Sequence, residues 1–449
     1  MKVLLVRPPA PNKLSFTKVL DNEPLELEYL HTILKNNGHL DYIYDGLVEK
    51  DSIATTIKRE NPDVIAITGY ITQENLMKKY CKIAKNINPN IVTVVGGVHV
   101  QRNYERLYDS NIDFMLRSES MDAFLDFINY LNGSDIPISN INGLCYKADG
   151  AYVVNELKAT CINSLPIPDR AHFYKYKKQF RYLDLTEVAT VKTAFSCPYN
   201  CNFCYCTLLS NGRYTARDLN LVIEELKGLD CTNVQIVDDD FLVDKKRLWE
   251  FIRLVKENNI KKTYICYGRA DFIVANPDII KALKEIGFRY FLVGLEAVDD
   301  SQLTAYNKQT SVELNKKCVE VINDAGADCI ALMIVGIDAT KDDFDNIHKW
   351  VVTNNVKYVT VSIFTPIPGT PLYEEYKDKL ITDNIEHWDF LHLVLEPVNM
   401  SKSQFYKEYF KLFMKLYKIA KDTGVYDFMD LDFYKNMLSD YLKRMIRDN

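Results

Sequence analysis

Three cysteines stand close together near the middle of the chain, at Cys197, Cys201 and Cys204. They follow an apolar, β-branched run, Val188–Phe195, so the spacing Cys-x-x-x-Cys-x-x-Cys falls in a loop after an expected strand. Four thiolates saturate a [4Fe–4S] cluster, so three of them leave one iron open to a ligand that the protein does not supply. An amine and a carboxylate on one molecule fit that position, and the methionine end of S-adenosylmethionine (SAM) carries this pair.

Zinc sites and disulfides also use closely spaced cysteines. A zinc ion needs a fourth ligand, but Cys206 is crowded against Cys204, and no further Cys-x-x-Cys or His-x-His pair follows. A disulfide requires an oxidising compartment, whereas the first residues form a strand-like run that does not resemble a signal peptide. We therefore expect a cytoplasmic protein in which the three cysteines hold iron, with zinc as the alternative.

Residues Ser196–Tyr205, with the sequence Ser-Cys-Pro-Tyr-Asn-Cys-Asn-Phe-Cys-Tyr, resemble the cluster loop of the radical SAM enzymes. The match includes the aromatic Phe203 before the third cysteine, which in that family lies near the adenine of SAM. The resemblance implies a [4Fe–4S] cluster on the three cysteines, SAM as a cofactor, and a flavodoxin- or ferredoxin-type electron donor as a partner. It also implies cleavage of SAM to a 5′-deoxyadenosyl radical.

Strand and helix patterns alternate from the cysteine loop onward. Apolar, β-branched runs lie at Val188–Phe195, Asn233–Val237, Thr263–Tyr267, Tyr290–Leu295, Cys329–Val335 and Tyr358–Phe364. Segments with helical spacing lie at Leu219–Leu229, Leu248–Lys256, Ile279–Ile286, Leu314–Ala325 and Phe344–Val352. Because βα alternation calls for a parallel sheet with right-handed crossovers, six such units predict an open, partial (β/α)6 barrel. The family resemblance implies the same fold.

Polar residues stand at the predicted carboxyl ends of these strands, where ligands gather in α/β sheets. Asp238, Asp239 and Asp240 end the second strand, Arg269 follows the third, and Glu296 ends the fourth. An aspartate before a helix also serves as an N-cap, which is the alternative role for each of the three. The resemblance implies that Asp239, Asp240, Arg269 and Glu296 line the SAM pocket.

Arg217 is a further candidate, in the segment Tyr214-Thr215-Ala216-Arg217-Asp218 after the cysteine loop. Its guanidinium has the charge to pair with the carboxylate of SAM, so we include it among the expected SAM ligands. The start of a helix is the competing role for this segment.

The N-terminal third reads as a second α/β unit. Strand-like runs lie at Lys2–Val6, Tyr42–Tyr44, Val64–Thr68, Ile91–Val95 and Asp113–Leu116. Helical stretches lie at Leu25–Leu34, Ile53–Arg59, Leu76–Ala84, Tyr104–Tyr108 and Ala123–Leu131. Five βα units predict a flavodoxin-like, doubly wound sheet, and glycines at its strand ends would let backbone approach a flat ligand.

Together with the second half, this unit resembles the cobalamin-binding domain of B12-dependent radical SAM enzymes. The matching phrases are Arg7-Pro8-Pro9, Pro62–Ala66, Gly96–His99, Arg117-Ser118-Glu119, Pro166–Arg170 and Thr365–Tyr373. The resemblance covers about residues 1 to 400 and implies cobalamin as a third cofactor. The expected contacts to cobalamin come from Thr68, Gly69, Tyr70, Thr72, Gly96, Gly97, His99 and Glu119.

One departure concerns the histidine that ligates cobalt from below in many cobalamin proteins, within Asp-x-His-x-x-Gly. None of the seven histidines here has glycine three residues later, so we expect no histidine from that motif below the corrin. For His99, a hydrogen bond to backbone or to the cofactor tail is favoured over metal ligation. A buried polar cap is the alternative role for Thr68, Gly69, Tyr70 and Thr72.

These patterns divide the chain into a cobalamin-binding domain (1–135), a hairpin and linker (136–185), a radical SAM domain (186–372) and a helical C-terminal region (373–449). The hairpin turns at Asp149-Gly150 and leads into an exposed linker through Pro166-Ile167-Pro168. In the C-terminal region, helices are expected at Lys402–Ala420 and Phe433–Arg447.

Composition narrows the function further. The net charge of −6 without a long basic block argues against a nucleic-acid partner, and no apolar run approaches the length of a membrane span. The sequence therefore predicts a cobalamin-dependent radical SAM enzyme that methylates an unactivated carbon through methylcobalamin. Ring formation or rearrangement with the same cofactors is one alternative, and a cobalamin-binding sensor or carrier is the other. The substrate stays open among small molecules, peptides and lipids.

Overall fold

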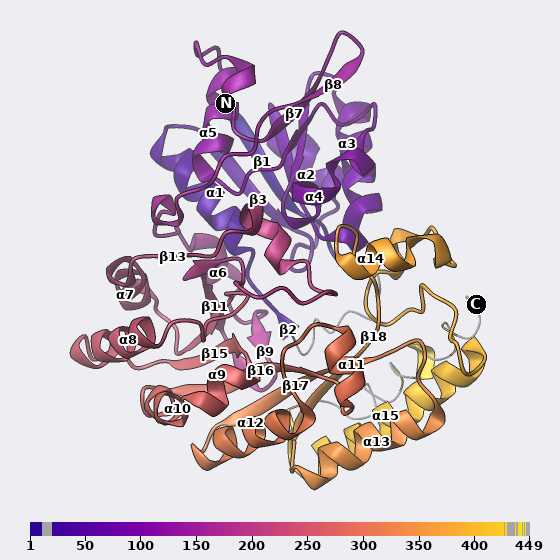
Figure 1. Cartoon of the computed structure of the whole chain (residues 1–449). Coiled ribbons are helices and arrows are strands. Elements are labelled where there is room, and N and C mark those ends of the chain that lie inside the picture. The colour runs from indigo at the N-terminus through magenta and orange to yellow at the C-terminus, as the bar shows by residue number, and fades with distance from the viewer. Residues whose placement is uncertain are drawn as a thin grey trace.

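The computed structural model describes residues 1–10 and 20–425, and beyond them residues 427, 428, 436, 439–441, 443 and 445. Two α/β units follow one another along the chain, and Figure 1 shows the first above the second. Each unit is built around its own sheet.

The first unit has strands β1 (Lys2–Arg7), β3 (Leu40–Asp45), β4 (Val64–Thr68), β5 (Val92–Gly96) and β6 (Phe114–Leu116), parallel and in the order β3-β1-β4-β5-β6. Its helices are α1 (Leu25–Asn36), α2 (Ile53–Glu60), α3 (Glu74–Ile87), α4 (Val98–Asn103) and α5 (Met121–Leu131). Helices α1 and α5 pack in one apolar cluster with Val3 and Leu5 of β1, whereas α2 and α3 pack in another with Leu4 and Val6. Alternate residues of one strand face opposite sides of a sheet, so this is the predicted doubly wound, flavodoxin-like fold.

Two local features of the first unit differ from the sequence-based expectation. The predicted helix Tyr104–Tyr108 is a 3₁₀ turn, η3 (Tyr104–Leu107), that continues α4. The hairpin of β7 (Leu144–Ala148) and β8 (Ala151–Val154), predicted as part of the linker, instead extends the first sheet, because β7 pairs antiparallel with β6. The pairing satisfies the outer backbone groups of β6, which would otherwise be a free edge.

The second unit is an open barrel of six parallel strands in sequence order: β11 (Val188–Val191), β14 (Asn233–Ile236), β15 (Thr263–Gly268), β16 (Phe288–Glu296), β17 (Asp328–Val335) and β18 (Tyr358–Ile363). Between them run α7 (Leu219–Gly228), α8 (Lys245–Glu257), α9 (Ala270–Ala275), α10 (Pro277–Glu285), α11 (Asp300–Ala305), α12 (Val312–Asp324) and α13 (Lys341–Thr353). One large apolar cluster joins α7, α8, α9, α10, α12 and α13 to the outward-facing strand residues. The predicted partial (β/α)6 barrel is confirmed.

The first predicted barrel strand, Val188–Phe195, is in fact two strands. After β11 the chain turns out of the barrel, and β12 (Ala194–Phe195) pairs antiparallel with β13 (Thr215–Ala216). Asp238 stabilises this break, because its carboxylate accepts hydrogen bonds from the backbone N–H groups of Thr193 (2.6 Å) and Ala194 (2.9 Å). The loop that carries the three cysteines therefore connects β12 to β13, a two-stranded sheet separate from the barrel.

A small three-stranded sheet closes the amino end of the barrel. It consists of β9 (Arg181–Tyr182), β10 (Leu185–Thr186) and, from the N-terminal part of the chain, β2 (Leu20–Asp21). Tyr182 and Leu185 pack against Ile265 and Tyr290, which point into the barrel. Among the described residues this packing covers the amino end of the barrel, and the cysteine loop lies at the carboxyl ends of the strands.

The segment between the units is less exposed than predicted. Ile167 is 41% exposed, but Arg170 is 5% exposed, and it is followed by the short helix α6 (Ala171–Tyr176). Burial of Arg170 follows from its ion pairs with Glu23 of the first unit and Glu225 of the second. Within the predicted exposed stretch Pro166-Ile167-Pro168, Ile167 is exposed as expected and Pro168 is buried.

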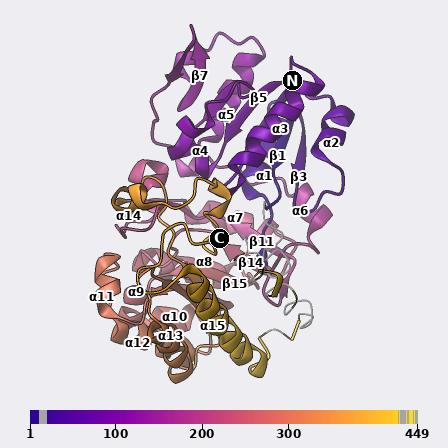
Figure 2. The same ribbon diagram turned by 90° about the vertical axis from the view of Figure 1, so that its right-hand side faces the viewer.

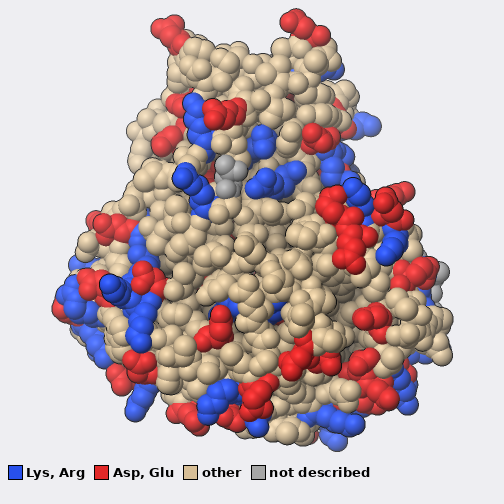
Figure 3. All heavy atoms as spheres, in the orientation of Figure 1, with Lys and Arg blue, Asp and Glu red and all other residues tan. Residues whose placement is uncertain are grey.

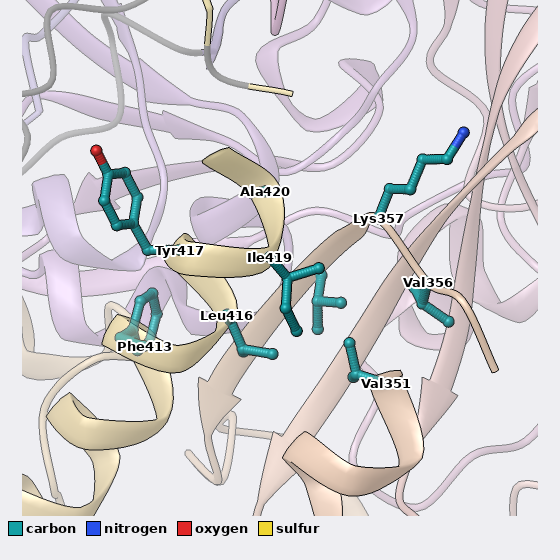
Figure 4. Close-up of a pocket in the computed structure, with 9 residues that line it drawn as sticks. Val351, Val356, Lys357, Phe413, Leu416, Tyr417, Ile419 and Ala420 are labelled. Atoms are coloured by element: carbon teal, nitrogen blue, oxygen red, sulfur yellow. The ribbon is translucent and has the colours of Figure 1, made fainter. Parts of the chain in front are cut away.

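The C-terminal region begins with α14 (Pro371–Tyr376) and includes the 3₁₀ turn η8 (Ile385–His387) and the long helix α15 (Lys402–Asp422). The part around α14 and η8 lies beside the junction of the two units, where η8 contacts α3 (Figures 1 and 2). Helix α15 packs on α13 and β18, and an apolar crevice remains at its last turns (Figure 4), lined by Val351, Val356, Lys357, Val359, Phe413, Leu416, Tyr417, Ile419 and Ala420. The second predicted helix, Phe433–Arg447, falls largely outside the described residues.

Candidate functional site

The cysteine loop runs from the end of β12 to the start of β13. Ser196 enters it with a φ of 63°, a left-handed conformation that turns the chain directly before Cys197. The backbone N–H of Cys204 donates to the carbonyl oxygen of Cys201 (3.2 Å), so these two cysteines share one tight turn. The 3₁₀ helix η6 (Cys206–Gly212) then leads back to β13.

The three thiols are free and partly or fully buried. Burial raises the pKa of Cys197 to about 12 and also raises the pKa of Cys201. A hydrogen bond with Cys206 lowers the pKa of Cys204. The guanidinium of Arg269 lies 3.8 Å from the sulfur of Cys201. Among the described residues, no three metal-ligating side chains converge on one ion site, so the match to an iron–sulfur cluster, in which each thiolate takes a different iron, rests on three free thiols in one loop and the cation beside Cys201.

The three aspartates after β14 have different surroundings. Asp238 is 1% exposed and serves the break between β11 and β12, so its role is structural. Asp239 is partly exposed, with Lys192 at 3.9 Å. Asp240 is buried, and burial raises its pKa to about 7. One of its oxygens accepts from the backbone of Leu242, and the other has no hydrogen-bond partner among the described residues.

Arg269 connects the cysteine loop to the segment after β16. Its guanidinium lies 3.8 Å from the ring centroid of Tyr199 and donates to the carbonyl oxygen of Lys308 (2.8 Å). It also pairs with Asp271 (3.0 Å) in the first turn of α9. The side chain is therefore fixed on three sides, beside two residues of the cysteine loop.

Glu296 and Lys308 form a buried ion pair at the end of β16, with 2.7 Å between Nζ and Oε1. Glu296 has a φ of 63°, a strained conformation for a glutamate that aims its side chain back over the strand. Gly294 leaves the space for this pair, because a Cβ there would lie 2.1 Å from the Glu296 oxygen and 2.7 Å from the Lys308 nitrogen. Sequence reasoning identified Glu296 and missed Lys308.

Lys308 also approaches the cysteine loop. Its Nζ lies 5.9 Å from the ring centroid of Phe203, and Phe203 packs edge-on against Tyr306 at 5.4 Å. Burial acts to lower the pKa of Lys308, but the Glu296 carboxylate overcomes this effect and the pKa is raised. An ammonium, a carboxylate and an aromatic ring thus meet beside the three cysteines. A charged amino-acid group attached to an aromatic base would find complementary partners here.

Arg217 is not brought to this pocket. Its side chain is fully buried, and its guanidinium bonds to Glu225 of α7 and to the carbonyl oxygens of Leu165 and Pro166 (3.4 Å each). The guanidinium therefore faces the linker segment and α7, away from Lys308. The competing role for its segment, the start of a helix, is confirmed, because Asp218 is the N-cap of α7.

The predicted cobalamin contacts gather at the carboxyl edge of the first sheet. Thr68 ends β4, Gly96 ends β5, and a Cβ on Gly97 would lie 2.3 Å from the Thr68 hydroxyl. A Cβ on Gly69 would likewise lie 2.7 Å from the sulfur of Met77. Gly69 and Gly97 therefore permit contacts within the protein, a structural reason that differs from the approach to a ligand expected from sequence. Thr72 lies in the 3₁₀ turn η2 (Ile71–Gln73) that follows.

His99 and Glu119 have protein partners in this structure. The Nε2 atom of His99 lies 2.8 Å from a carboxylate oxygen of Glu74, inside the first unit. Glu119 accepts a hydrogen bond from the hydroxyl of Ser210 (2.8 Å), which belongs to η6 of the second unit. A second bond crosses the same junction, from Nε of Arg102 to the carbonyl oxygen of Leu208 (2.6 Å). The segment that follows the cysteines is thus attached to the carboxyl edge of the first sheet.

Tyr70 lies where the two units face each other. Its side chain is 59% exposed, yet burial raises its pKa to about 12, and Asp239 and Cys206 of the second unit are among its electrostatic neighbours. On the face shown in Figure 3, the band between the two units is mostly uncharged.

Two family models match the chain, one for each unit. Residues 16–128 match the B12 binding domain, and residues 191–351 match the radical SAM superfamily. In the part of the chain that the structure describes, no helix is long and apolar enough to cross a membrane.

Curated relatives span nearly the whole chain. An uncharacterised methyltransferase of Pyrococcus horikoshii is 28% identical over 93% of this chain and 92% of its own length. The hopanoid C-3 methylase of Methylococcus capsulatus is 26% identical over 94% and 82%. An anaerobic magnesium-protoporphyrin IX monomethyl ester cyclase of Rubrivivax gelatinosus is 25% identical over 85% and 71%.

Two solved structures share the fold at low sequence identity. The cobalamin-dependent SAM radical enzyme OxsB, with aqua-cobalamin and SAM bound, superposes with a TM-score of 0.74 at 15% identity, covering 91% of this chain and 65% of that one. The radical SAM methyltransferase TsrM of Kitasatospora setae, with cobalamin and a [4Fe–4S] cluster bound, gives 0.69 at 13% identity over 93% and 88%. The cofactors predicted from sequence, a [4Fe–4S] cluster, SAM and cobalamin, are those of the two matched families, and this chain belongs to the radical SAM enzymes that carry an N-terminal B12-binding domain.

Proposed function

We propose that this radical SAM enzyme methylates an unactivated carbon of its substrate with cobalamin as the methyl carrier. The observation that carries the proposal is the junction at which Arg102 and Glu119, at the carboxyl edge of the B12-binding unit, bond to η6, the segment that follows the cysteines at the carboxyl end of the barrel. Ligands of such sheets bind at these edges, so both cofactor sites open toward one space. When bound, the cluster and SAM supply a 5′-deoxyadenosyl radical and cobalamin supplies a methyl group.

Each side chain of the candidate site has a proposed role. The cluster is held by Cys197, Cys201 and Cys204. The guanidinium of Arg269 contacts the sulfur of Cys201. Glu296 accepts the ammonium of SAM. Its neighbour Lys308 donates to the SAM carboxylate, in place of Arg217.

Further contacts complete the two cofactor sites. Phe203 packs near the adenine of SAM, and Asp239 and Asp240 accept from the ribose hydroxyls. Around cobalamin we place the residues at the carboxyl edge of the first sheet: Thr68, Gly69, Tyr70, Thr72, Gly96, Gly97, His99 and Glu119. An external donor, of the flavodoxin or ferredoxin type, delivers the electron.

The names of the relatives support methylation, and they also include one alternative reaction, ring formation. The hopanoid C-3 methylase and a bacteriochlorophyllide d C-8(2)-methyltransferase of Chlorobaculum tepidum, 30% identical over 56% of this chain, favour transfer of a methyl group. The magnesium-protoporphyrin cyclase favours ring formation with the same cofactors. These relatives are named for polycyclic lipids and tetrapyrroles, so a substrate with a large apolar ring system is the first to test. The intact cysteine loop argues against a cobalamin carrier without chemistry.

The test uses SAM with a deuterated methyl group, a reductant, cobalamin and a panel of polycyclic lipids and tetrapyrroles. A methylase consumes one SAM for the radical and another to remethylate the carrier, so 5′-deoxyadenosine and S-adenosylhomocysteine should both accumulate and the product should carry the label. Deoxyadenosine alone, with an unlabelled product, would assign the chain to the cyclases.

Matched cysteine variants link this activity to the cluster. Cys201→Ala should lose iron and both products, because each cluster cysteine binds its own iron. Cys206→Ala should keep them, since Cys206 is outside the proposed ligand set. Full cluster content in Cys201→Ala would contradict the ligand assignment.

A further inference from the structure

Five charged side chains form a buried cluster between the two units. Glu23 and Glu28 come from the first unit, Arg170 from the linker, and Arg217 and Glu225 from the second unit, and each is at most 5% exposed. Arg170 contacts all three glutamates, at 2.5 Å for Glu23, 2.6 Å for Glu225 and 3.7 Å for Glu28. We call this group the joint cluster. Its members come from segments up to about 200 residues apart, so it can form only when both units are folded and docked.

Part of the joint cluster takes the place of a missing barrel strand. Strand β11 is the first strand of the open barrel, so its outer edge has no neighbouring strand. At Thr190, the backbone N–H and hydroxyl both donate to Glu23, and the carbonyl oxygen accepts from Arg170 at 2.8 Å. A side-chain pair from outside the barrel thus satisfies the backbone groups that an edge would leave unpaired.

The joint cluster also reaches both ends of the cysteine loop. Before the loop, Thr190 of β11 is held by Glu23 and Arg170. After the loop, the backbone N–H of Arg217 donates to the carbonyl oxygen of Thr193 (2.8 Å), and its guanidinium bonds to Glu225. Glu225 in turn bonds to Arg170. Strand β11, which leads toward the loop, and Arg217, which follows β13, are therefore both tied to Arg170, and through it to Glu23 of the first unit.

Charge distinguishes the two glutamates of the first unit. With two arginines and three glutamates the cluster would hold one excess negative charge, which burial disfavours. Burial together with the neighbouring Glu23 raises the pKa of Glu28 well above its usual range, so the charged form of Glu28 is disfavoured in the cluster. One of its oxygens accepts the backbone N–H of Phe173 at 2.9 Å, an acceptor role that the carbonyl oxygen of an amide can also fill. An amide at position 28 would keep the shape and charge of the group, whereas an amide at position 23 would remove a charge that Arg170 needs.

We propose that Arg170 and Glu23 are positioning residues that fix the cysteine loop relative to the B12-binding unit, and so set the separation of the cluster from cobalamin. The inference rests on the two cofactor sites and does not depend on whether the reaction is methylation. Because a misplacement of about 1 Å can cost a large factor in rate, a fixed separation matters for any reaction that uses both cofactors.

The separation can be measured by electron paramagnetic resonance. Cob(II)alamin and the reduced cluster are both paramagnetic, and cob(II)alamin enhances the relaxation of the cluster signal in a manner that depends steeply on their distance. We expect Glu23→Gln and Arg170→Met to keep their iron and bound cobalamin but to show a changed relaxation enhancement. The kcat for substrate turnover, which uses both cofactors, should fall on the order of tenfold, with the KM for SAM within about twofold.

Two control variants separate positioning from general destabilisation. Glu28→Gln should match the parent protein in relaxation and in kcat. Lys35→Ala, which removes an exposed ion pair from α1 to Asp169 of the same linker, should also match it. Parent-like relaxation and kcat in Glu23→Gln would overturn the proposal, and so would an equal effect of Glu28→Gln. If Arg170→Met does not fold, Glu23→Gln decides the question, because it keeps the shape of the side chain and the pair of Arg170 with Glu225. Failure of methyl transfer leaves the relaxation result intact, so the two proposals fail separately.

Discussion

The pair of Glu296 and Lys308 combines three energetically costly features: close opposite charges, burial and backbone strain. Two opposite charges are held at 2.7 Å, both nearly buried, on a backbone that is strained at Glu296. A buried ion pair is weak support for stability, since desolvation offsets its attraction. Strain and desolvation at one point are more often found where a ligand is bound. An amino acid that carries both charges can exchange partners with the pair without leaving either side chain unpaired.

Replacing Lys308 tests this assignment. Lys308→Met keeps the length of the side chain and removes its charge, so SAM affinity should weaken by about 2 kcal/mol, roughly thirtyfold, the scale of a charged hydrogen bond. Lys308→Arg should retain most of the affinity, because it keeps the charge. Equilibrium dialysis of SAM against reconstituted protein measures the change, with iron content as the control. Normal SAM binding by Lys308→Met would show that the carboxylate is held elsewhere.

Asp21 gives a prediction about pH. It is 7% exposed, one of its oxygens has no hydrogen-bond partner among the described residues, and burial raises its pKa to about 7 although Arg7 acts to lower it. The folded protein therefore binds this proton more tightly than the unfolded chain between about pH 4 and about pH 7. Stability should decline through that window, by at most about 1.4 kcal/mol per pH unit.

The variant Asp21→Asn isolates this contribution. Its free energy of unfolding, measured in urea at pH 5 and pH 8, should fall less between the two values than that of the parent protein. An identical fall in both proteins would mean that Asp21 does not titrate in this window.

At the scale of single residues, the sequence predicts best what is local. The three cysteines lie within eight positions of one another, so their spacing alone identifies them. Lys308 follows Glu296 by twelve residues and reaches it only because α11 folds the chain back, so no local pattern signals the pair. Arg217 has the charge expected of a SAM ligand, but its partner Glu225 lies on the next helix and holds it in the joint cluster.

Among the elements, strand β16 shows how the end of a strand can be shaped around a ligand. Gly294, two residues before Glu296, is the position where a side chain would collide with the ion pair. We expect Gly294→Ala to weaken SAM binding at least tenfold, because the added methyl group displaces Glu296 and Lys308. Stability should change by less than about 1 kcal/mol, since the colliding atoms are the ends of flexible side chains. Dialysis of SAM and thermal unfolding measure the two effects.

A matched glycine provides the control. Gly228 ends α7, and a Cβ there would meet no described atom within 4 Å. Gly228→Ala should therefore bind SAM normally and be slightly more stable, as expected when alanine replaces glycine in a helix. Equal loss of SAM binding in both variants would contradict the role of Gly294.

The elements themselves were largely predictable because their cores are periodic. All six barrel strands and the five parallel strands of the first sheet fall where apolar runs predict them, to within a few residues. The errors arise where a distant group competes with the local pattern. Asp238 ends β11 early by accepting hydrogen bonds from the N–H groups of Thr193 and Ala194, and β6 pairs with the hairpin that was assigned to the linker segment. Neither interaction can be predicted from the residues close to it in the sequence.

For the whole molecule, the joint cluster couples the stability of the two units. We expect the apo protein to unfold in a single calorimetric transition, because separating the units would expose buried charges. Arg170→Met leaves buried carboxylates without their cation, at a cost of about 3–5 kcal/mol, so the two units should unfold in separate transitions. A single transition in both proteins would show that other contacts are sufficient to couple the units.

The small sheet at the amino end of the barrel bears on the order in which the chain folds. Strand β2 pairs with β9. Leu20 can therefore pair only after Tyr182, about 160 residues later in the chain, has been synthesised. During synthesis the B12-binding unit leaves the ribosome first and folds with β2 still unpaired. The barrel then forms against β2, which is already held in place by the first unit, to which it is joined through α1. The first unit therefore acts as a template for the second, and an early stop in translation beyond the first sheet would leave an exposed β2 edge for chaperones to shield.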